Sequence, residues 1–355
     1  MTAGGVSGVY EPAERRLASW TTLRLGGAAE RLVVFTDEEA LCAEAAAADA
    51  RSEPFTVLGS GSNVVVADAG LTGTVAVVGT RGIRPGRRDG GTVEVTVAAG
   101  EPLAELVTWS VSEGLAGLES LAGIPGTVGA TPVQNVGAYG QEVSDTLCEV
   151  RAYDRRCRRM VVLPAARCGL GHRTSRFRRT DRWLLSAVTF RLESGALSAP
   201  VRHPEVARLL GTEVSSRVPI AEVPAAVTAI RRTKGMVLSR DDPDTRSVGS
   251  FFANPIVSAA GAEEAGRRVG AVPPQWPDRD GVKLSAAWLI ERAGWRRGDG
   301  LGDIRISTKH ALALTNRGGG TTRQLLELAG RIRAGVARTS GVRLEPEPTL
   351  LGCTL

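Results

Sequence analysis

Short apolar runs alternate with a helical pattern in the N-terminal part of the chain. The runs RLVVF (31–35) and FTVLG (55–59) have the length and the continuous hydrophobicity of β-strands. Between them, EEALCAEAAAAD (38–49) is an alanine-rich stretch that predicts a helix, with Asp37 near its start. The pattern therefore predicts a strand, a helix and a second strand.

The same alternation continues toward the C-terminus, where 193–232 is a polar, helix-containing segment. Leu325, Leu328 and Ile332 recur at helical spacing in the last predicted helix, and Gly341 follows as its C-terminal stop. The chain shows no internal repeat and no low-complexity linker. Further strands are predicted at 92–100, 147–154, 159–164 and 183–192, and further helices at 102–114, 282–294 and 321–341.

Two glycine-rich segments interrupt this pattern. In GSGSNVVV (59–66), two glycines would let backbone N–H groups approach an anion, and short polar side chains lie beside them. An ordinary turn between two strands would have the same residues, so both interpretations stay open. The second segment, SLAGIPGTVGATPVQNVGAYGQEV (120–143), has no period of 2 or 3.6 and predicts neither helix nor strand. Its glycines suit a backbone that lies close against something flat or charged, and a purely structural loop is the alternative.

Length and composition narrow the class of protein. A chain of 355 residues exceeds one compact core, so two or three domains are expected. The apolar content of 43% and the charged content of 23% are those of a soluble globular protein. No apolar run of membrane-spanning length and no secretory signal is present, so we expect a cytoplasmic location. The five cysteines are scattered, which indicates free, mostly buried thiols and no metal site.

The positive charge is concentrated in one stretch. The whole chain carries a net charge of +6, yet 151–182 holds eleven arginines against two aspartates, a local charge of +9. This excess suits an anionic ligand or a nucleic acid, and a solvated basic face is the alternative. An aromatic content of 4% argues against nucleic acid, because stacking on bases needs aromatic side chains.

Seven motifs occur in a particular order between TTLRLGGAAE (21–30) and the C-terminus. In this order the chain resembles the UDP-N-acetylenolpyruvoylglucosamine reductase family, flavoenzymes of peptidoglycan precursor synthesis. The motifs are VLGSGSNVVV, GLESLAGIPGTVGATPVQNVGAYGQEV, RTSRF, GSFFANP, VKLSAAWLIERAG, STKHALALTN and LEPEPTLLG.

The resemblance implies an α+β fold. A two-subdomain FAD-binding fold of the vanillyl-alcohol-oxidase/PCMH type would precede a third α+β domain that binds the substrate. The implied boundaries are 1–80 for FAD-binding subdomain 1, 81–233 for FAD-binding subdomain 2 including an insert at 193–232, 234–345 for the substrate-binding domain, and 346–355 for a C-terminal segment returning to the active site.

The resemblance also implies a cofactor and a reaction. Non-covalent FAD would accept a hydride from NADPH and pass it to C3 of a UDP-linked enolpyruvyl sugar. We expect a monomer with no nucleic-acid partner and no membrane partner. The residues expected to bind the cofactor are Gly59, Ser60, Gly61, Ser62, Asn63, Gly123, Ile124, Pro125, Gly126, Gly129, Asn135, Ala138 and Tyr139.

Three residues carry the implied chemistry at the substrate. Ser250 would protonate C2, Arg173 would hold the carboxylate with its planar fork, and Glu347 would stabilise the same centre or relay protons. His310 is expected to be structural. The residues expected to bind the substrate are His172, His203, Lys234, Asn254 and Arg292.

Two positions depart from the family branch with the extra insert. That branch carries a tyrosine before the active-site arginine and a second tyrosine in the insert, where this chain has His172 and His203. Histidine titrates near neutrality, so substrate binding would depend on pH. Three hypotheses stay open: the peptidoglycan reductase, a reductase of the same fold acting on another enol ether or nucleotide-linked substrate, and a basic protein that binds a polyanion through 151–182.

Overall fold

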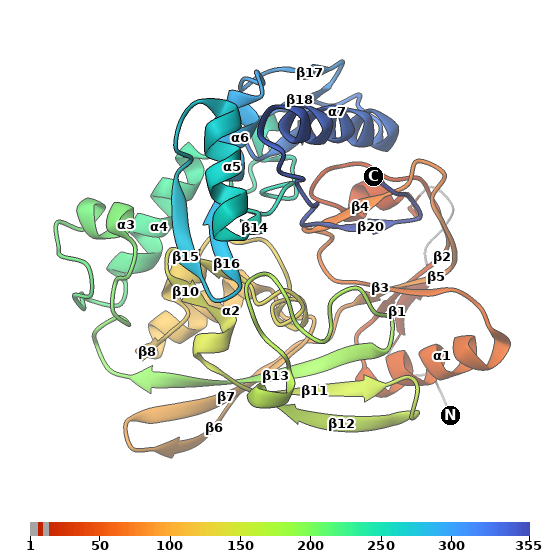
Figure 1. Cartoon of the computed structure of the whole chain (residues 1–355). Helices are drawn as coiled ribbons and strands as arrows, with labels where there is room; N and C mark the ends of the chain where they lie inside the picture. Colours follow the sequence, from red (N-terminus) through yellow and green to blue (C-terminus); the bar gives the residue numbers. More distant parts are fainter. Residues whose placement is uncertain (1–5, 10–13) are drawn as a thin grey trace. The chain divides into compact units, whose positions relative to one another are not determined.

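The chain folds into two compact units, each built from separate stretches of sequence. The computed structural model describes residues 6–9 and 14–355 (Figure 1). Unit 1 comprises the described residues up to Arg15 together with Ala29–Gly61 and Thr72–Thr233, and unit 2 comprises Arg16–Ala28, Ser62–Leu71 and Lys234–Leu355. The division into domains drawn from the resemblance stays a prediction.

The elements of unit 1 follow the predicted alternation of strands and helices. Its helices are α1 (Glu38–Arg51), α2 (Leu103–Ser112), α3 (Pro204–Leu209) and α4 (Glu222–Thr233). Its strands are β1 (Val6–Val9), β2 (Ala29–Phe35), β3 (Phe55–Leu58), β5 (Leu71–Val78), β6 (Ile83–Asp89), β7 (Thr92–Ala98), β8 (Leu115–Ala116), β9 (Gly137–Ala138), β10 (Gln141–Glu142), β11 (Leu147–Asp154), β12 (Arg159–Pro164) and β13 (Trp183–Ser194).

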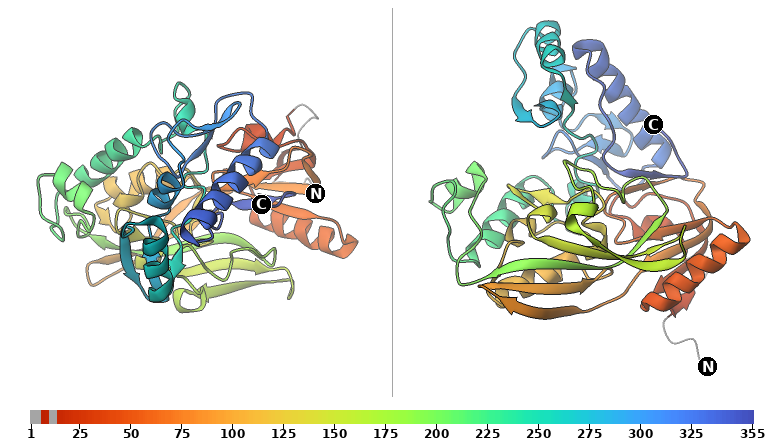
Figure 2. Two further views of the ribbon diagram at one scale, coloured as in Figure 1. Left: turned by 45° about the horizontal axis from the view of Figure 1, so that its top comes forward. Right: turned by 60° about the horizontal axis from the view of Figure 1, so that its bottom comes forward.

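Two sheets organise unit 1. The larger has the order β12-β11-β13-β7-β6, with β8 paired to the end of β13 (Figure 1). The smaller has the order β1-β2-β5-β3, and α1 packs on it through Leu41 and Ala45. Asp37 caps α1 by accepting a hydrogen bond from the N–H of Ala40 at 2.9 Å, as its position before the helix predicts. Figure 2 shows the larger sheet and α1 from two further sides.

Unit 2 has short strands and a long helix. Its helices are α5 (Ala259–Val269), α6 (Ala286–Arg292) and α7 (Thr322–Ser340), and its strands are β4 (Val64–Val66), β14 (Ile256–Val257), β15 (Gln275–Asp278), β16 (Gly281–Leu284), β17 (Gly300–Leu301), β18 (Ile304–Ile306), β19 (Leu314–Asn316) and β20 (Thr349–Leu351). Both α5 and α6 pack on α7, whose buried stripe includes Leu325, Leu328 and Ile332 (Figure 2). Thr321 and Gln324 form a capping box at its start, and Gly341 ends it in the left-handed conformation, as predicted.

Two expectations from the sequence are wrong. The predicted helix at 282–294 begins only at Ala286, because Val282 and Leu284 belong to β16 and the side chain of Ser285 caps the helix. The cysteines carry no disulfide, but only Cys168 is buried. Cys157 is exposed because it lies in the turn between β11 and β12.

Strands β5 and β6 were not among the predicted elements, although the run TVAVV (74–78) in β5 resembles the apolar runs at 31–35 and 55–59. Gly73 interrupts β5, while proline and charged residues break the alternation of β6. Within residues 6–9 and 14–355, no helix combines the length and the hydrophobicity that crossing a membrane requires.

Candidate active site

Within unit 1, the first residue of one glycine-rich segment lies against the other segment. A Cβ atom at Gly59, which follows β3, would lie 2.7 Å from Oγ1 of Thr127 in the second segment. A Cβ atom at Gly129 would lie 2.5 Å from Cβ of Ala99, and the N–H of Gly129 donates to the carbonyl of Ala99 at 2.8 Å. Close packing therefore leaves no room for a Cβ atom at either position.

The second segment has the irregular backbone that its composition predicts. It contains only single helical turns and the two-residue strands β9 and β10. Gly123, Gly126 and Gly140 have positive φ, and so do Asn135 (45°) and Tyr139 (50°). Left-handed conformations cost free energy for residues other than glycine and are concentrated at functional sites. This strain marks the segment as a candidate site.

A tight turn at Gly171–Thr174 is hydrogen-bonded to this segment. Gly171 and Thr174 exchange backbone hydrogen bonds of 3.1 and 3.3 Å, so that His172 and Arg173 form the tip. Arg173 has a φ of 50°, a third strained residue.

Three hydrogen bonds hold the turn and the residues after it in place. Nδ2 of Asn135 donates to the carbonyl of Gly171 at 3.2 Å, and Nη2 of Arg173 donates to the carbonyl of Gly137 at 3.1 Å. The hydroxyl of Ser175 donates to the carbonyl of Val133 at 2.6 Å. These bonds fix the position of Arg173 relative to the glycine-rich segment.

Asn135 acts in the structure mainly as a support. Its Nδ2 also donates to Glu142 at 2.8 Å, and its Oδ1 accepts the N–H of Ser144 at 2.9 Å. The side chain is 1% exposed. Any contact of this position with a cofactor would therefore come from the backbone.

Tyr139, His203 and Arg231 form a cluster beside Arg173. The rings of Tyr139 and His203 meet edge to face with centroids 5.0 Å apart. Burial raises the pKa of Tyr139, and the nearby Arg231 opposes that shift. Burial also lowers the pKa of Arg231, where Tyr139 acts to raise it and Arg173 to lower it. The guanidinium stays charged at neutral pH, so two arginines lie near each other at this point.

Arg231 was not among the residues expected at the site. It follows the buried Ile230 on α4 and lies four residues after the buried Val227. Long charged side chains commonly border a buried helix stripe, so the sequence carries no specific signal for Arg231. His203, by contrast, was expected to bind substrate, and in the structure its Nδ1 accepts the N–H of Glu205 at 3.3 Å and caps α3.

Six of the eleven arginines in 151–182 are bound within unit 1. Arg151, Arg155 and Arg182 form ion pairs with Glu38, Asp49 and Asp154. Arg173, Arg176 and Arg178 donate to backbone carbonyls. The excess charge of this stretch is therefore partly used in holding the sheet and the turn, which weakens the polyanion hypothesis.

In unit 2, backbone pairing brings the segments of Ser250 and Glu347 together. The N–H of Glu347 donates to the carbonyl of Phe251 at 2.9 Å, and the N–H of Phe251 donates to Leu312 at 2.8 Å. The rings of Phe251 and Phe252 are fully buried and anchor this segment in the core. The sequence therefore places Ser250 next to two core aromatics, with its own side chain half-buried.

Other expected residues of unit 2 have structural partners. Oδ1 of Asn254 accepts the N–H of Ala286 at 3.0 Å at the start of α6. Arg292 is exposed and stacks on the ring of Trp288 at 5.1 Å. Burial lowers the pKa of His310 to about 4, with Lys234 and Arg297 adding to the shift, so His310 is neutral. Its Nδ1 accepts the N–H of Leu312 at 3.1 Å, in agreement with a structural role.

The expected residues divide between the two units. Unit 1 holds Gly59, Ser60, Gly61, Gly123, Ile124, Pro125, Gly126, Gly129, Asn135, Ala138, Tyr139, His172, Arg173 and His203. Unit 2 holds Ser62, Asn63, Lys234, Ser250, Asn254, Arg292 and Glu347.

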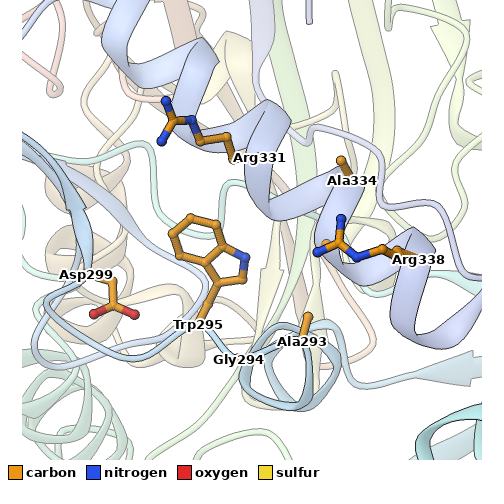
Figure 3. A pocket seen from close by; sticks show the side chains of 8 residues that line it. Ala293, Gly294, Trp295, Asp299, Arg331, Ala334 and Arg338 are labelled. Carbon is orange, nitrogen blue, oxygen red and sulfur yellow. The ribbon is translucent and has the colours of Figure 1, made fainter.

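Unit 2 also has an open hollow of about 480 Å³ between α7 and the segment that follows α6. Figure 3 shows Trp295 lying between Arg331 and Arg338, with Asp299 to one side. Glycine at position 335 makes room for the indole, because a Cβ atom there would lie 3.2 Å from its Nε1. None of the expected site residues lines this hollow, so it is not part of the candidate active site.

Comparison with known proteins identifies the class and then the family. Residues 29–159 match the model of an FAD-binding domain, and the strained, glycine-rich site lies largely within them. The chain is thus an FAD-dependent oxidoreductase with the predicted FAD-binding fold. Residues 241–351 match the C-terminal domain of UDP-N-acetylenolpyruvoylglucosamine reductase. Together with the relatives below, this match shows that the chain belongs to the UDP-N-acetylenolpyruvoylglucosamine reductase family.

Relatives match over nearly the whole chain. The UDP-N-acetylenolpyruvoylglucosamine reductase of Thermobifida fusca is 51% identical, over 96% of this chain and 97% of its own length. That of Salinispora arenicola is 49% identical, over 98% of both chains. The crystal structure of the reductase MurB from Thermus caldophilus is 25% identical with a TM-score of 0.64, and the match covers 94% of this chain and 97% of that one.

The residues of unit 1 fit a flavin nucleotide. Gly59 packs against Thr127 with no room for a Cβ atom, and a glycine-rich backbone of this kind can offer N–H groups to a diphosphate. The amide oxygen of Gln134 is buried and accepts no hydrogen bond from any residue that the structure describes. A buried acceptor normally has a donor, and the N–H of a bound ring system would supply one. The expected loops are therefore suited to FAD.

Proposed function

We propose that the chain reduces UDP-N-acetylglucosamine enolpyruvate to UDP-N-acetylmuramate, with NADPH as hydride donor. The observation that carries the proposal is the similarity to reductases of this name at about half identity over nearly the whole chain. The proposal includes a cytoplasmic monomer without nucleic-acid or membrane partners. Bound FAD would supply the two-electron chemistry that links NADPH to C3 of the enolpyruvyl ether.

Arg173 would hold the carboxylate of the enolpyruvyl group. Hydride addition at C3 places negative charge on C2 and the carboxylate, and preorganised positive charge stabilises it. The hydrogen bond from Arg173 to Gly137 and the tight turn support this role, because they orient the guanidinium before substrate arrives. Arg231 would add a second positive charge in the same region.

Ser250 would deliver the proton to C2, with Glu347 as a relay or stabiliser. A serine hydroxyl is a weak acid, so it protonates only a strongly basic carbon held close to it. The backbone pairing of Phe251 with Glu347 supports the pair of roles, because it keeps the carboxylate-bearing segment beside the serine. A half-buried carboxylate can return the proton that the hydroxyl gives up.

The remaining expected residues would bind the nucleotide-sugar part. Lys234 would neutralise phosphate charge, and Nδ2 of Asn254 would donate to the sugar, since its Oδ1 serves α6. His172, His203 and Arg292 would complete this group. Nδ1 of His203 caps α3, which fixes the orientation of the ring.

The test is oxidation of NADPH by the yellow, FAD-loaded protein with the enolpyruvyl nucleotide as acceptor. We expect one product molecule, heavier than the substrate by two hydrogen atoms, for each NADPH consumed. Oxidation no faster than the background rate with oxygen would reject the proposal. Ser250→Ala is expected to leave flavin reduction by NADPH intact and to block reoxidation by the nucleotide.

A second candidate is a reductase of the same fold with a different enol ether or nucleotide-linked substrate. His172 and His203, which stand where tyrosines are expected, are the observation that favours it. Normal flavin reduction by NADPH without turnover of the enolpyruvyl nucleotide would support this candidate over the first.

A further inference from the structure

Glu119 is a buried carboxylate at the start of the glycine-rich segment. It begins the single helical turn Glu119–Leu121 and is 1% exposed. It accepts the N–H of Gly117 at 2.6 Å, the N–H of Ala199 at 2.5 Å and Nε2 of Gln141 at 3.1 Å. A carboxylate accepts all three, whereas a glutamine would turn its own NH₂ group toward one of these donors.

Gln141, near the end of the glycine-rich segment, is hydrogen-bonded to the residues at its start. Its Oε1 accepts the N–H of Ser120 at 2.7 Å while its Nε2 donates to Glu119. The two ends of the glycine-rich segment are therefore joined by one pair of side chains. The loop between them has few regular hydrogen bonds of its own, so this pair limits its movement.

The third partner of Glu119, Ala199, belongs to the insert at 193–232. Neighbouring residues pair within the insert, with the N–H of Ser198 donating to Val218 at 2.8 Å and that of Val201 donating to Ser216 at 2.9 Å. The N–H of Ala199 donates instead to Glu119, outside the insert. Glu119 thus connects the insert to the start of the glycine-rich segment.

The insert makes a second contact with the glycine-rich segment a few residues after Ala199. Arg202 donates to the carbonyl of Gly140 at 3.1 Å and pairs with Asp145 at 2.9 Å. The ring of His203 meets that of Tyr139. Because only two residues lie between Ala199 and Arg202, a shift at the first contact would be passed directly to the second.

We propose that Glu119 is a positioning residue that sets the register of the insert against the glycine-rich segment. Through this register it holds His203 beside Tyr139, where the nucleotide part of the substrate would bind. The identity of that ligand rests on the proposed function, whereas the hydrogen bond from Ala199 to Glu119 does not depend on it. The side chain of Glu119 accepts hydrogen bonds from Gly117, Ala199 and Gln141, none of which is expected to act in the reaction, so its loss would affect substrate binding more than chemistry.

The experiment compares Glu119→Gln with wild type, both loaded with FAD. Amide exchange at Ala199 is expected to rise at least about tenfold, because its N–H loses a charged acceptor. The KM for the enolpyruvyl nucleotide is expected to rise about five- to tenfold, with the rate of flavin reduction by NADPH within about twofold. Glu119→Asp, which keeps the charge but shortens the side chain, should change both quantities in the same direction if the glutamine variant does not fold.

Glu101→Gln is the matched control. Glu101 is also buried in unit 1 and accepts one backbone N–H, from Gly82 at 2.7 Å, outside the insert. It is expected to lower Tm without changing exchange at Ala199 or KM. Exchange at Ala199 that is unchanged in the Glu119 variants, or altered equally in the control, would overturn the proposal. If wild type does not turn over the nucleotide, the proposed function is wrong. Amide exchange at Ala199 still tests whether Glu119 holds the insert in place.

Discussion

The hairpin formed by β11 and β12 and the turn at Gly171–Thr174 use arginine in opposite ways, although both lie in the same arginine-rich stretch. Around the hairpin, Arg155 and Arg182 each meet a carboxylate at 2.5 Å. At the turn, Arg173 donates to a backbone carbonyl at 3.1 Å and has a strained backbone.

The difference shows why a count of arginines says little about function. A carboxylate cancels the charge of a guanidinium and turns it into a structural contact. A carbonyl orients a guanidinium without cancelling its charge, and the strain at Arg173 requires a compensating benefit elsewhere. The two regions should therefore respond to substitution in different ways, one in stability and the other in activity.

The largest expected effect is on catalysis at the turn. Arg173→Met should lower kcat for nucleotide reduction by about 10²- to 10³-fold, because it removes a preorganised charge from the developing carbanion. Flavin reduction by NADPH should change little, and Tm should stay close to that of wild type. Stopped-flow measurement of the two half-reactions checks this result.

Arg176→Met is the matched control in the same stretch. Arg176 donates to the carbonyl of Arg167 and stacks on Trp183 at 5.2 Å, so its loss should affect Tm and leave kcat unchanged. Equal losses of activity in the two variants would remove the distinction between the turn and the rest of the stretch.

The next largest effect is on stability at the hairpin. Asp154 is 3% exposed and hydrogen-bonded by Arg182, which holds the pKa of Asp154 well below its usual range. Asp154→Asn should lower Tm by about 4–8 °C at neutral pH, because Arg182 loses its partner. Activity at moderate temperature should stay within about twofold of wild type.

The pH dependence of this effect follows from the depressed pKa. The pair stabilises the fold above the unfolded pKa of about 4, and that stability is lost as pH falls from there toward the folded value. The gap in Tm between wild type and Asp154→Asn should therefore narrow below about pH 4. A gap that is independent of pH would show that the charge of Asp154 contributes nothing.

A smaller effect is expected at the ion pair that joins α1 to the hairpin. Arg155 contacts both carboxylate oxygens of Asp49 and lies 5.6 Å from the ring of Phe55. Arg155→Met keeps much of the packing and loses the pair, so Tm should fall by about 2–4 °C with KM unchanged. Thermal unfolding followed by circular dichroism checks the first value, and steady-state kinetics check the second. A rise in KM would mean that the hairpin, like the turn, contributes to the site.

Strands β2, β3, β7, β11, β12 and β13, most helices and the irregular loop were predictable because their signals are local. The stripe of Leu325 and Leu328 determines α7, and the mixture of glycine and proline at 120–143 excludes regular structure. The error at 282–294 has the same origin. Alternating Val282 and Leu284 fit a short strand as well as a helix, and only pairing with β14 and β15 decides between them.

The supports of the site were not predictable from the sequence. Asn135 meets Gly171 across 36 positions, and Glu119 meets Ala199 across 80. Such contacts depend on how the chain folds back on itself, and neither residue type reveals its partner. Arg173 could be singled out only through the family motif, because it is one of eleven arginines in 151–182.

The smallest expected effect tests the position beside Arg173 at the tip of the turn. His172 is exposed there, and tyrosine is the residue expected in this branch of the family. His172→Tyr should keep activity within about threefold of wild type across the pH range, because both side chains can donate a hydrogen bond to the substrate. The pH profile of kcat/KM for the enolpyruvyl nucleotide measures this.

Thr174→Ser, on the same turn and also exposed, is the control and should leave the profile as in wild type. Loss of turnover in His172→Tyr with the control unaffected would mean that the turn serves a different substrate. Arg173 would then keep its role as the holder of an anion, while the anion itself would change. The contrast between the turn and the hairpin would still hold. It depends on whether a carbonyl or a carboxylate accepts from each arginine, and not on which molecule Arg173 binds.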